Sequence, residues 1–130
     1  MTFKKINHAF IMAAGRGTRL MPLTKKIPKG LVKFKQSSLI ASGIKKLKKY
    51  IDFVHISVGY KGPILAKHLI EEKVSSIINT DKKGNSWWIF NSVFKSLDSP
   101  LYVLTCDNVT NIDFKKIEKD YYKKGQPLCM

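Results

Sequence analysis

The sequence predicts an α/β fold in which helices cover both faces of a doubly wound, mostly parallel sheet. Short apolar or β-branched segments alternate with segments whose apolar residues recur every three to four positions. The strand-then-helix alternation occurs four times within 130 residues, a length that suits one domain with one core. The most distinctive polar segments follow the first and fourth strands. Parallel strands present their carboxyl ends at one edge of the sheet, which is where such folds bind ligands.

The first half of the chain accounts for two strands and two helices. Residues 8–13 form an apolar run suited to a buried parallel strand, and residues 14–30 form a long loop containing glycines and prolines. Residues 39–50 have apolar positions on one face and lysines on the other, as in an amphipathic helix. The β-branched segment 53–58 predicts the second strand. A Gly-Pro pair opens the helix predicted for 62–72, because proline is favoured in a first turn.

The second half repeats the alternation. We expect a third strand at 74–79, a helix at 85–97 and a fourth strand at 101–105. A final helix, with an aspartate cap before it and a glycine after it, is expected to extend to Tyr122. Residues 126–130 look like the beginning of a fifth strand. We therefore expect residues 1–130 to be a single domain with an incomplete sheet, the amino-terminal part of a longer domain.

The composition limits the possible partners. The 24 basic and 9 acidic residues give a net charge of +15, but the lysines are scattered in pairs and no run reaches five like charges. A solvated lysine surface explains this better than nucleic-acid binding as the main role. No apolar stretch approaches the length of a membrane span, so no membrane partner is expected. Cys106 and Cys129 lack the spacing of a metal site, which favours reduced thiols in the cytoplasm.

The loop after the first strand has the residue types of a phosphate-binding site. Gly15 and Gly17 allow the backbone amides to approach a ligand closely. Arg16 and Arg19, the only arginines of the chain, can bind phosphate oxygens bidentately, and Lys29 adds a further positive charge. These residues predict that the loop holds the phosphates of a nucleoside triphosphate.

Two common nucleotide motifs are absent. The P-loop pattern Gly-x-x-x-x-Gly-Lys-Ser/Thr does not occur. A dinucleotide fingerprint requires a third glycine where this chain has Leu20, and an acidic residue at the end of the second strand, which is also missing.

Residues 13–24, Ala-Ala-Gly-Arg-Gly-Thr-Arg-Leu-Met-Pro-Leu-Thr, followed by Pro28-Lys29, resemble the signature of the sugar-phosphate nucleotidylyltransferases. The spacing from the arginines to the Pro-Lys pair is that of this family. Weaker similarity continues at residues 57–61, at 84–86 and at 105–108. The resemblance implies a Rossmann-like nucleotidyltransferase fold. Family members are considerably longer, and the similarity stops before their sugar-binding half and second metal carboxylate.

The resemblance also implies a reaction, in which an NTP and a sugar 1-phosphate give an NDP-sugar and pyrophosphate, as in nucleotide-sugar and cell-surface polysaccharide synthesis. Arg19 would hold the β- and γ-phosphates, Lys29 would stabilise charge at the α-phosphate, and Asp107 would bind Mg²⁺. The remaining nucleotide contacts would come from Ala13, Ala14, Gly15, Arg16, Gly17, Thr18, Asn79, Gly84 and Asn85. Structural alternatives are a tight turn for the glycines, a surface position for Lys29 and a capping role for Asp107.

The donor base and the acceptor stay open. Gly84-Asn85-Ser86 replaces the family's Gly-Thr-Ala segment and precedes two tryptophans, at least one of which is expected in the core. An asparagine at the end of the third strand, here Asn79, is a feature that resembles the phosphocholine cytidylyltransferase branch of the family. A cytidylyltransferase acting on phosphocholine or a similar amino alcohol is therefore a second candidate. A third is an NTP-binding fragment that lacks catalysis. The sequence does not determine the oligomeric state.

Overall fold

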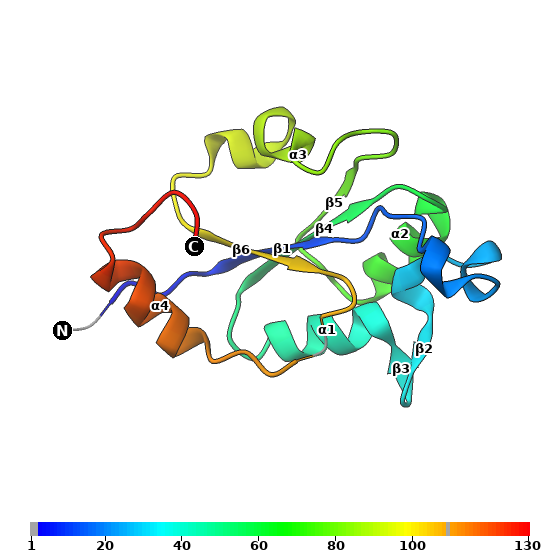
Figure 1. Cartoon of the computed structure of the whole chain (residues 1–130), viewed down its shortest axis with the longest axis horizontal. Coiled ribbons are helices and arrows are strands. Elements are labelled where there is room, and N and C mark those ends of the chain that lie inside the picture. Colours follow the sequence, from blue (N-terminus) through cyan, green and yellow to red (C-terminus); the bar gives the residue numbers. More distant parts are fainter. Residues whose placement is uncertain (1–2, 109) are drawn as a thin grey trace.

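A four-stranded parallel sheet forms the centre of the molecule, seen in a computed structural model that describes residues 3–108 and 110–130 (Figure 1). Its strands are β1 (His8–Met12), β4 (Phe53–Val58), β5 (Ser76–Asn79) and β6 (Leu101–Thr105), in the spatial order β5–β4–β1–β6. The chain builds outward from β1 through β4 to β5, and then returns to place β6 on the other side of β1. This reversal confirms the predicted doubly wound sheet and creates a switch point between β1 and β6.

Helices cover both faces of the sheet. α1 (Leu39–Leu47) and α2 (Gly62–Glu71) lie on one face, while α3 (Trp87–Asn91) and the 3₁₀ helix Val93–Ser96 lie on the other (Figure 1). α4 (Phe114–Lys123) follows β6. Within the described part of the chain, no helix has the length and apolar character that crossing a bilayer requires.

Side chains alternate between two buried clusters, as a sheet covered on both sides requires. Ala9 and Ile11 of β1 face the large cluster under α1 and α2, while Phe10 packs with Trp88 and Phe94 on the opposite face. The Phe10 and Trp88 rings stack with centroids 3.8 Å apart. The prediction that a tryptophan belongs to the core is therefore confirmed for Trp88.

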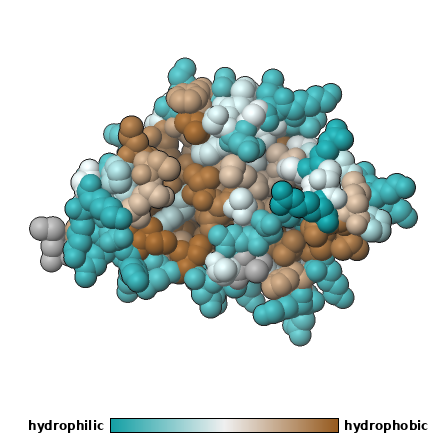
Figure 2. Space-filling view, viewed as in Figure 1, coloured by the Kyte–Doolittle hydropathy of each residue, from teal (hydrophilic) through white to brown (hydrophobic). Residues whose placement is uncertain are grey.

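The edge strand β6 is only partly covered. Val103 is 49% exposed and Leu101 is partly buried. In the orientation of Figure 1, apolar surface extends across the middle of the molecule, with hydrophilic surface around it (Figure 2).

Two predicted helices are shorter than expected. The helix predicted for 39–50 ends at Leu47 and continues as a turn. The helix predicted for 85–97 is divided into α3 and the 3₁₀ helix, with Ser92 extended between them. The Ser92 hydroxyl donates to the Trp88 carbonyl and accepts from the Phe94 amide. Serine side chains that bond to the local backbone in this way compete with helix hydrogen bonds.

Other boundaries also differ from the prediction. The long loop contains the 3₁₀ turns Thr18–Leu20, Leu23–Lys25 and Lys29–Leu31, and an unpredicted hairpin follows it, made of β2 (Lys33–Phe34) and β3 (Ser37–Ser38).

The fifth strand predicted to begin at 126–130 is wrong, because these residues are irregular. Gln126 has a φ of 58° and its amide donates to the Tyr121 carbonyl, so it closes α4. Pro127 has no amide to donate to a neighbouring strand.

Candidate functional site

A cavity of about 510 Å³ opens at the carboxyl ends of the strands, on the face that carries α3. The glycine loop after β1 and the segment after β6 form two of its sides, and the segment after β5 forms a third. The cavity is lined by Met12, Ala14, Gly15, Lys29, Ser57, Thr80, Lys82, Lys83, Gly84, Asn85, Trp88, Thr105, Cys106 and Asp107. The switch point of the sheet is therefore hollow, and its mixed lining includes three lysines and one carboxylate.

The glycine loop folds back on itself at Gly17. Gly17 has a φ of 61°, a conformation that side chains rarely adopt. A Cβ there would lie 2.9 Å from Thr24 Cγ2 and 3.0 Å from Lys29 Cβ, so only glycine fits. The fully buried Thr24 donates its hydroxyl to the Gly17 carbonyl at 2.7 Å. The left-handed turn thus brings Lys29 close to the loop.

The end of β4 holds the same loop from the other side. A Cβ on Gly59 would lie 2.9 Å from both the Cβ and the carbonyl oxygen of Ala14, so the two backbones cross in close contact. The Tyr60 amide donates to the Ala14 carbonyl at 3.1 Å, and its hydroxyl donates to the Thr24 carbonyl at 2.9 Å. Because both ends of the loop are bonded to Tyr60, the loop is held rigidly against the sheet.

Lys29 and Asp107 meet across the cavity although 78 positions separate them in sequence. The Lys29 ammonium donates to Asp107 Oδ2 at 2.7 Å. This hydrogen bond is the main cause that holds the pKa of Asp107 below its usual range, and a further bond from Thr105 acts in the same direction. The carboxylate is therefore ionised at neutral pH and partly exposed to the cavity.

The segment between β5 and α3 forms the wall opposite the glycine loop. Thr80 is buried and its amide donates to the Val58 carbonyl, which extends the sheet past the end of β5. Trp88 donates its indole N–H to the Asn85 carbonyl at 2.7 Å. Lys82 and Lys83 lie between these anchors and add two positive charges to the lining.

Six of the predicted site residues line this cavity and six do not. Those that line it are Ala14, Gly15, Lys29, Gly84, Asn85 and Asp107. Those outside the lining are Ala13, Arg16, Gly17, Thr18, Arg19 and Asn79.

The residues outside the lining have other environments. Ala13 is buried in the α1-side core, and its amide donates a hydrogen bond to the Ser57 hydroxyl at 3.1 Å. Arg16 and Arg19 are exposed, and Arg16 lies over the Tyr60 ring. The side chain of Asn79 accepts a hydrogen bond from the Asp81 amide.

Sequence reasoning missed several residues that line the cavity. Thr80, Lys82 and Lys83 directly follow the third predicted strand, so the rule that ligands bind at the carboxyl ends of strands could have identified them. Ser57 lies within β4 and offered no such signal.

The cavity offers one protein carboxylate to a metal ion, so a bound ligand would have to supply further oxygen ligands. Among the described residues there is no group of three or more His, Cys, Asp or Glu side chains able to hold a metal ion. Asp107 offers one hard carboxylate at the cavity. Mg²⁺ often binds through one or two carboxylates, with waters and substrate phosphates completing its octahedron.

This combination of fold and site defines an α/β protein of the Rossmann-like class, with a glycine loop, a lysine and a carboxylate at the switch point of a parallel sheet. Comparison with known families identifies it further. The family described as nucleotidyl transferase matches residues 8–130, and the chain belongs to this family. The predicted family resemblance is therefore confirmed.

The curated relatives include GlmU and several mannose-1-phosphate guanyltransferases. The chain is 28% identical over 116 residues to the bifunctional protein GlmU of Methanococcus aeolicus, covering 88% of this chain and 28% of that protein. It is 31% identical over 118 residues to a mannose-1-phosphate guanyltransferase of Neurospora crassa, covering 84% of this chain and 32% of that protein. The chain thus spans about a third of the length of these relatives.

Solved structures agree on the fold. The CTP:phosphocholine cytidylyltransferase LicC of Streptococcus pneumoniae is 34% identical, with a TM-score of 0.69, over 82% of this chain and 48% of that one. A UDP-glucose pyrophosphorylase in complex with UDP-glucose has the same TM-score of 0.69 at 21% identity, over 92% of this chain and 55% of that one. HddC of Yersinia pseudotuberculosis, in complex with GMP-PN, reaches a TM-score of 0.71 at 21% identity.

Proposed function

We propose that the protein to which this chain belongs transfers a nucleotidyl group from an NTP to a phosphorylated small molecule, with a sugar 1-phosphate as the first candidate acceptor. The observation that carries the proposal is the Lys29–Asp107 pair, 2.7 Å apart, beside the glycine loop at the switch point. The pair places the Lys29 ammonium, which suits phosphate oxygens, beside the Asp107 carboxylate, which suits Mg²⁺.

In the proposed reaction, an oxygen of the acceptor phosphate attacks the α-phosphorus of the NTP and forms a new P–O bond. The bond from the α-phosphorus to the bridging oxygen breaks, and pyrophosphate leaves with that electron pair. Both reactants are anionic, so catalysis depends mainly on alignment and on offsetting negative charge.

The residues of this chain would divide that task. The amides from Ala14 to Thr18 would hold the phosphates, and Lys29 would stabilise the charge that grows at the α-phosphate. Arg19 would reach the β- and γ-phosphates, since its side chain is exposed beside the loop. Asp107 would hold Mg²⁺, which when bound offsets phosphate charge. Asn79, Gly84 and Asn85 would contact the nucleoside.

A cytidylyltransferase that acts on phosphocholine or a similar phosphorylated amino alcohol is the second candidate. It is favoured by the 34% identity to LicC, which is higher than the 28% and 31% identity to the two sugar-phosphate enzymes. A cationic acceptor of this kind requires an aromatic cage, whereas a sugar requires hydrogen-bonding groups around its hydroxyls. A third candidate is an NTP-binding fragment without catalysis.

The test is a pyrophosphate-release assay with UTP, CTP, dTTP, ATP and GTP, each with pooled sugar 1-phosphates or with phosphocholine. It should use this chain and any longer reading frame that contains it. We expect release with one base and one acceptor class from the longer protein, and weak or absent release from residues 1–130 alone. Tight Mg²⁺-dependent NTP binding without release from the longer protein would favour the third candidate. Absence of NTP binding would refute the proposal. We place the reaction in the cytoplasm, where NTPs are abundant.

A further inference from the structure

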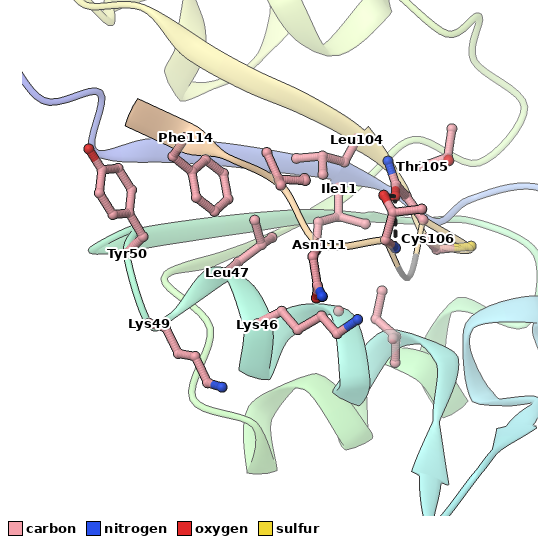
Figure 3. A pocket seen from close by; sticks show the side chains of 15 residues that line it. Ile11, Lys46, Leu47, Lys49, Tyr50, Leu104, Thr105, Cys106, Asn111 and Phe114 are labelled. Atoms are coloured by element: carbon pink, nitrogen blue, oxygen red, sulfur yellow. Dashed lines mark hydrogen bonds between the residues drawn. The ribbon is translucent and has the colours of Figure 1, made fainter. Parts of the chain in front are cut away.

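A second cavity, of about 310 Å³, lies on the opposite face of the sheet, between α1 and the segment that follows β6 (Figure 3). Its interior is apolar. Ile11, Ile40 and Leu47 are nearly fully buried where they line it, and Leu104 and Phe114 complete the walls. The reaction proposed above does not use this cavity.

Gly43 of α1 keeps this cavity open. Glycine inside a helix is less favourable than alanine by about 0.5–1 kcal/mol. Gly43 is not among the glycines with positive φ, so its backbone conformation does not require glycine. A Cβ built on it would meet no atom within 4 Å, so close packing does not require glycine either. Because Gly43 lines the cavity, a side chain there would instead occupy part of the empty space.

The rim of the cavity is polar and basic. Lys46 of α1 and Lys49 of the turn that follows it lie on one side, and Asn108, Thr110 and Asn111 lie on the other. Figure 3 shows Lys46 extending from α1 toward Asn111, with Leu47, Leu104 and Ile11 above them in this view. None of the described residues that line the cavity is acidic. An apolar interior with a basic rim is complementary to a ligand that has an apolar body and an anionic group.

The two cavities share part of their walls. Thr105 and Cys106 line both of them, and Asp107 follows directly. A ligand in the second cavity would therefore contact the segment that positions Asp107 in the first. If binding at one cavity changes the affinity of the other, the reverse effect must have the same size.

We propose that the second cavity binds a small amphipathic anion, a single ring that carries a carboxylate or a phosphate, and that this binding alters nucleotide affinity at the first cavity. The binding does not depend on the function proposed above, whereas the coupling rests on it.

The binding is tested by ¹H–¹⁵N NMR titration of the 130-residue chain with benzoate and with phenyl phosphate, and with benzyl alcohol as the neutral comparator. We expect both anions to shift the amides of Gly43, Leu47 and Asn111 and to bind at least threefold more tightly than the alcohol. A tighter fit for one anion assigns the carboxylate or the phosphate. The absence of shifts at these amides, or equal affinity for the alcohol, would overturn the proposal.

Variants separate the cavity from the general positive charge of the surface. Gly43→Leu fills the space and should abolish the shifts, and Gly43→Ala should weaken binding about threefold or more while the thermal midpoint stays the same or rises. The second variant keeps the test valid if the first does not fold. Lys49→Gln, in the turn after α1, should weaken binding of both anions, whereas Lys45→Gln, on α1 but outside the cavity lining, should not. Wild-type binding by Gly43→Ala, or equal effects of the two lysine variants, would contradict the proposed site.

The coupling is tested by titrating the protein with CTP or UTP in the presence of Mg²⁺, with and without saturating benzoate or phenyl phosphate. We expect the nucleotide Kd to change at least twofold, and the Kd of the anion to change by the same factor when nucleotide is present. Unchanged nucleotide affinity would overturn the coupling. Absence of nucleotide binding under both conditions, with intact anion binding, would instead refute the proposed function and leave the second site supported.

Discussion

At the scale of single residues, the candidate site combines groups whose positions have different physical causes. Gly17 is required by its left-handed backbone and its contacts with Thr24 and Lys29, whereas a Cβ on Gly15 would meet nothing within 4 Å. The hydrogen bond from Lys29 holds the pKa of Asp107 below its usual range. These differences allow structural and ligand-binding roles to be tested separately.

The two glycines should respond differently to alanine. We expect Gly17→Ala to lower the free energy of unfolding by about 1–3 kcal/mol, because the new Cβ is strained and clashes. Gly15→Ala should leave stability within about 0.5 kcal/mol of wild type but weaken NTP binding, since its Cβ would enter the first cavity. Urea unfolding and nucleotide titration measure the two effects. Equal stability of the two variants would contradict the assigned geometry.

The charged residues of the proposed reaction are tested in the longer protein. We expect Asp107→Ala and Arg19→Ala each to abolish turnover, at least 100-fold in kcat/KM, because each removes a group that would offset phosphate charge. Asp98→Ala, a surface carboxylate outside both cavities, is the matched control. Steady-state pyrophosphate release measures the effect, and a near-normal rate would exclude the residue from the role proposed here.

A histidine pair should make stability depend on pH. His8 Nδ1 lies 3.0 Å from His55 Nε2, and His55 Nδ1 lies 2.7 Å from Ser76 Oγ. Burial, with a smaller contribution from His8, lowers the pKa of His55 to about 4, and burial also lowers the pKa of His8. Because the unfolded chain binds these protons more readily, their contribution is present above pH 6.5 and is lost as the pH falls toward 4.

We therefore expect the free energy of unfolding to fall by about 2 kcal/mol between pH 7 and pH 5 through His55. Denaturant unfolding at both pH values measures the loss. The His55→Gln variant removes this titration and serves as the control, so its stability should change less over the same interval. An equal loss in the variant would show that other groups cause the pH dependence.

At the scale of elements, the helices are joined to the sheet by specific polar contacts as well as by apolar packing. Glu118 of α4 is 5% exposed, and its carboxylate accepts from the Ile6 amide at 2.9 Å, the Tyr50 hydroxyl at 2.8 Å and the Tyr102 hydroxyl at 3.2 Å. These bonds connect α4 with the approach to β1, with the end of the α1 segment and with β6. Burial and Glu118 raise the pKa of Tyr50 to about 12, so its hydroxyl remains a donor at neutral pH.

Removing this carboxylate should loosen α4. We expect Glu118→Ala to lower the free energy of unfolding by roughly 2–4 kcal/mol, because it leaves buried donors without an acceptor. Glu71→Ala, an exposed position on α2, should change it by less than about 0.5 kcal/mol. Chemical denaturation compares them. A Glu118→Ala variant as stable as wild type would show that water replaces the carboxylate at no cost.

At the scale of the whole molecule, the net charge of +15 is the dominant long-range term. Few acidic groups are available to offset it, since the described ion pairs that do not involve histidine number three: Lys5–Asp52, Lys29–Asp107 and Lys124–Asp120. Self-repulsion of this kind destabilises the compact state and is screened by salt.

Salt should therefore stabilise the protein. We expect the thermal midpoint to rise by roughly 2–5 °C between 20 and 300 mM NaCl, because the Debye length shortens below the spacing of many lysines. Differential scanning calorimetry measures the shift. A midpoint that falls with added salt would mean that attractive ion pairs, rather than repulsion, dominate.

Several strands and the family could be predicted from the sequence alone. Periodicity predicted β4 and β6 with their correct limits, because runs of apolar and β-branched residues bounded by turns are a local signal. The loop at 13–24 with Pro28-Lys29 indicated the family, since both parts of that motif lie within one short segment of the chain. Helix boundaries were less predictable, because Ser92 interrupts α3 through side-chain bonds that periodicity does not reveal.

Which residues share a site became apparent only from the three-dimensional arrangement of the chain. It brought Lys29 to 2.7 Å from Asp107, and it placed Lys82 and Lys83 in the lining while Arg16 and Arg19 lie outside it. The physical reason is that strand order determines which loops meet at the sheet edge, and strand order depends on packing between segments distant in sequence. The second cavity has the same origin, because the space beside Gly43 exists only once folding has brought α1 and the end of β6 to the same face of the sheet.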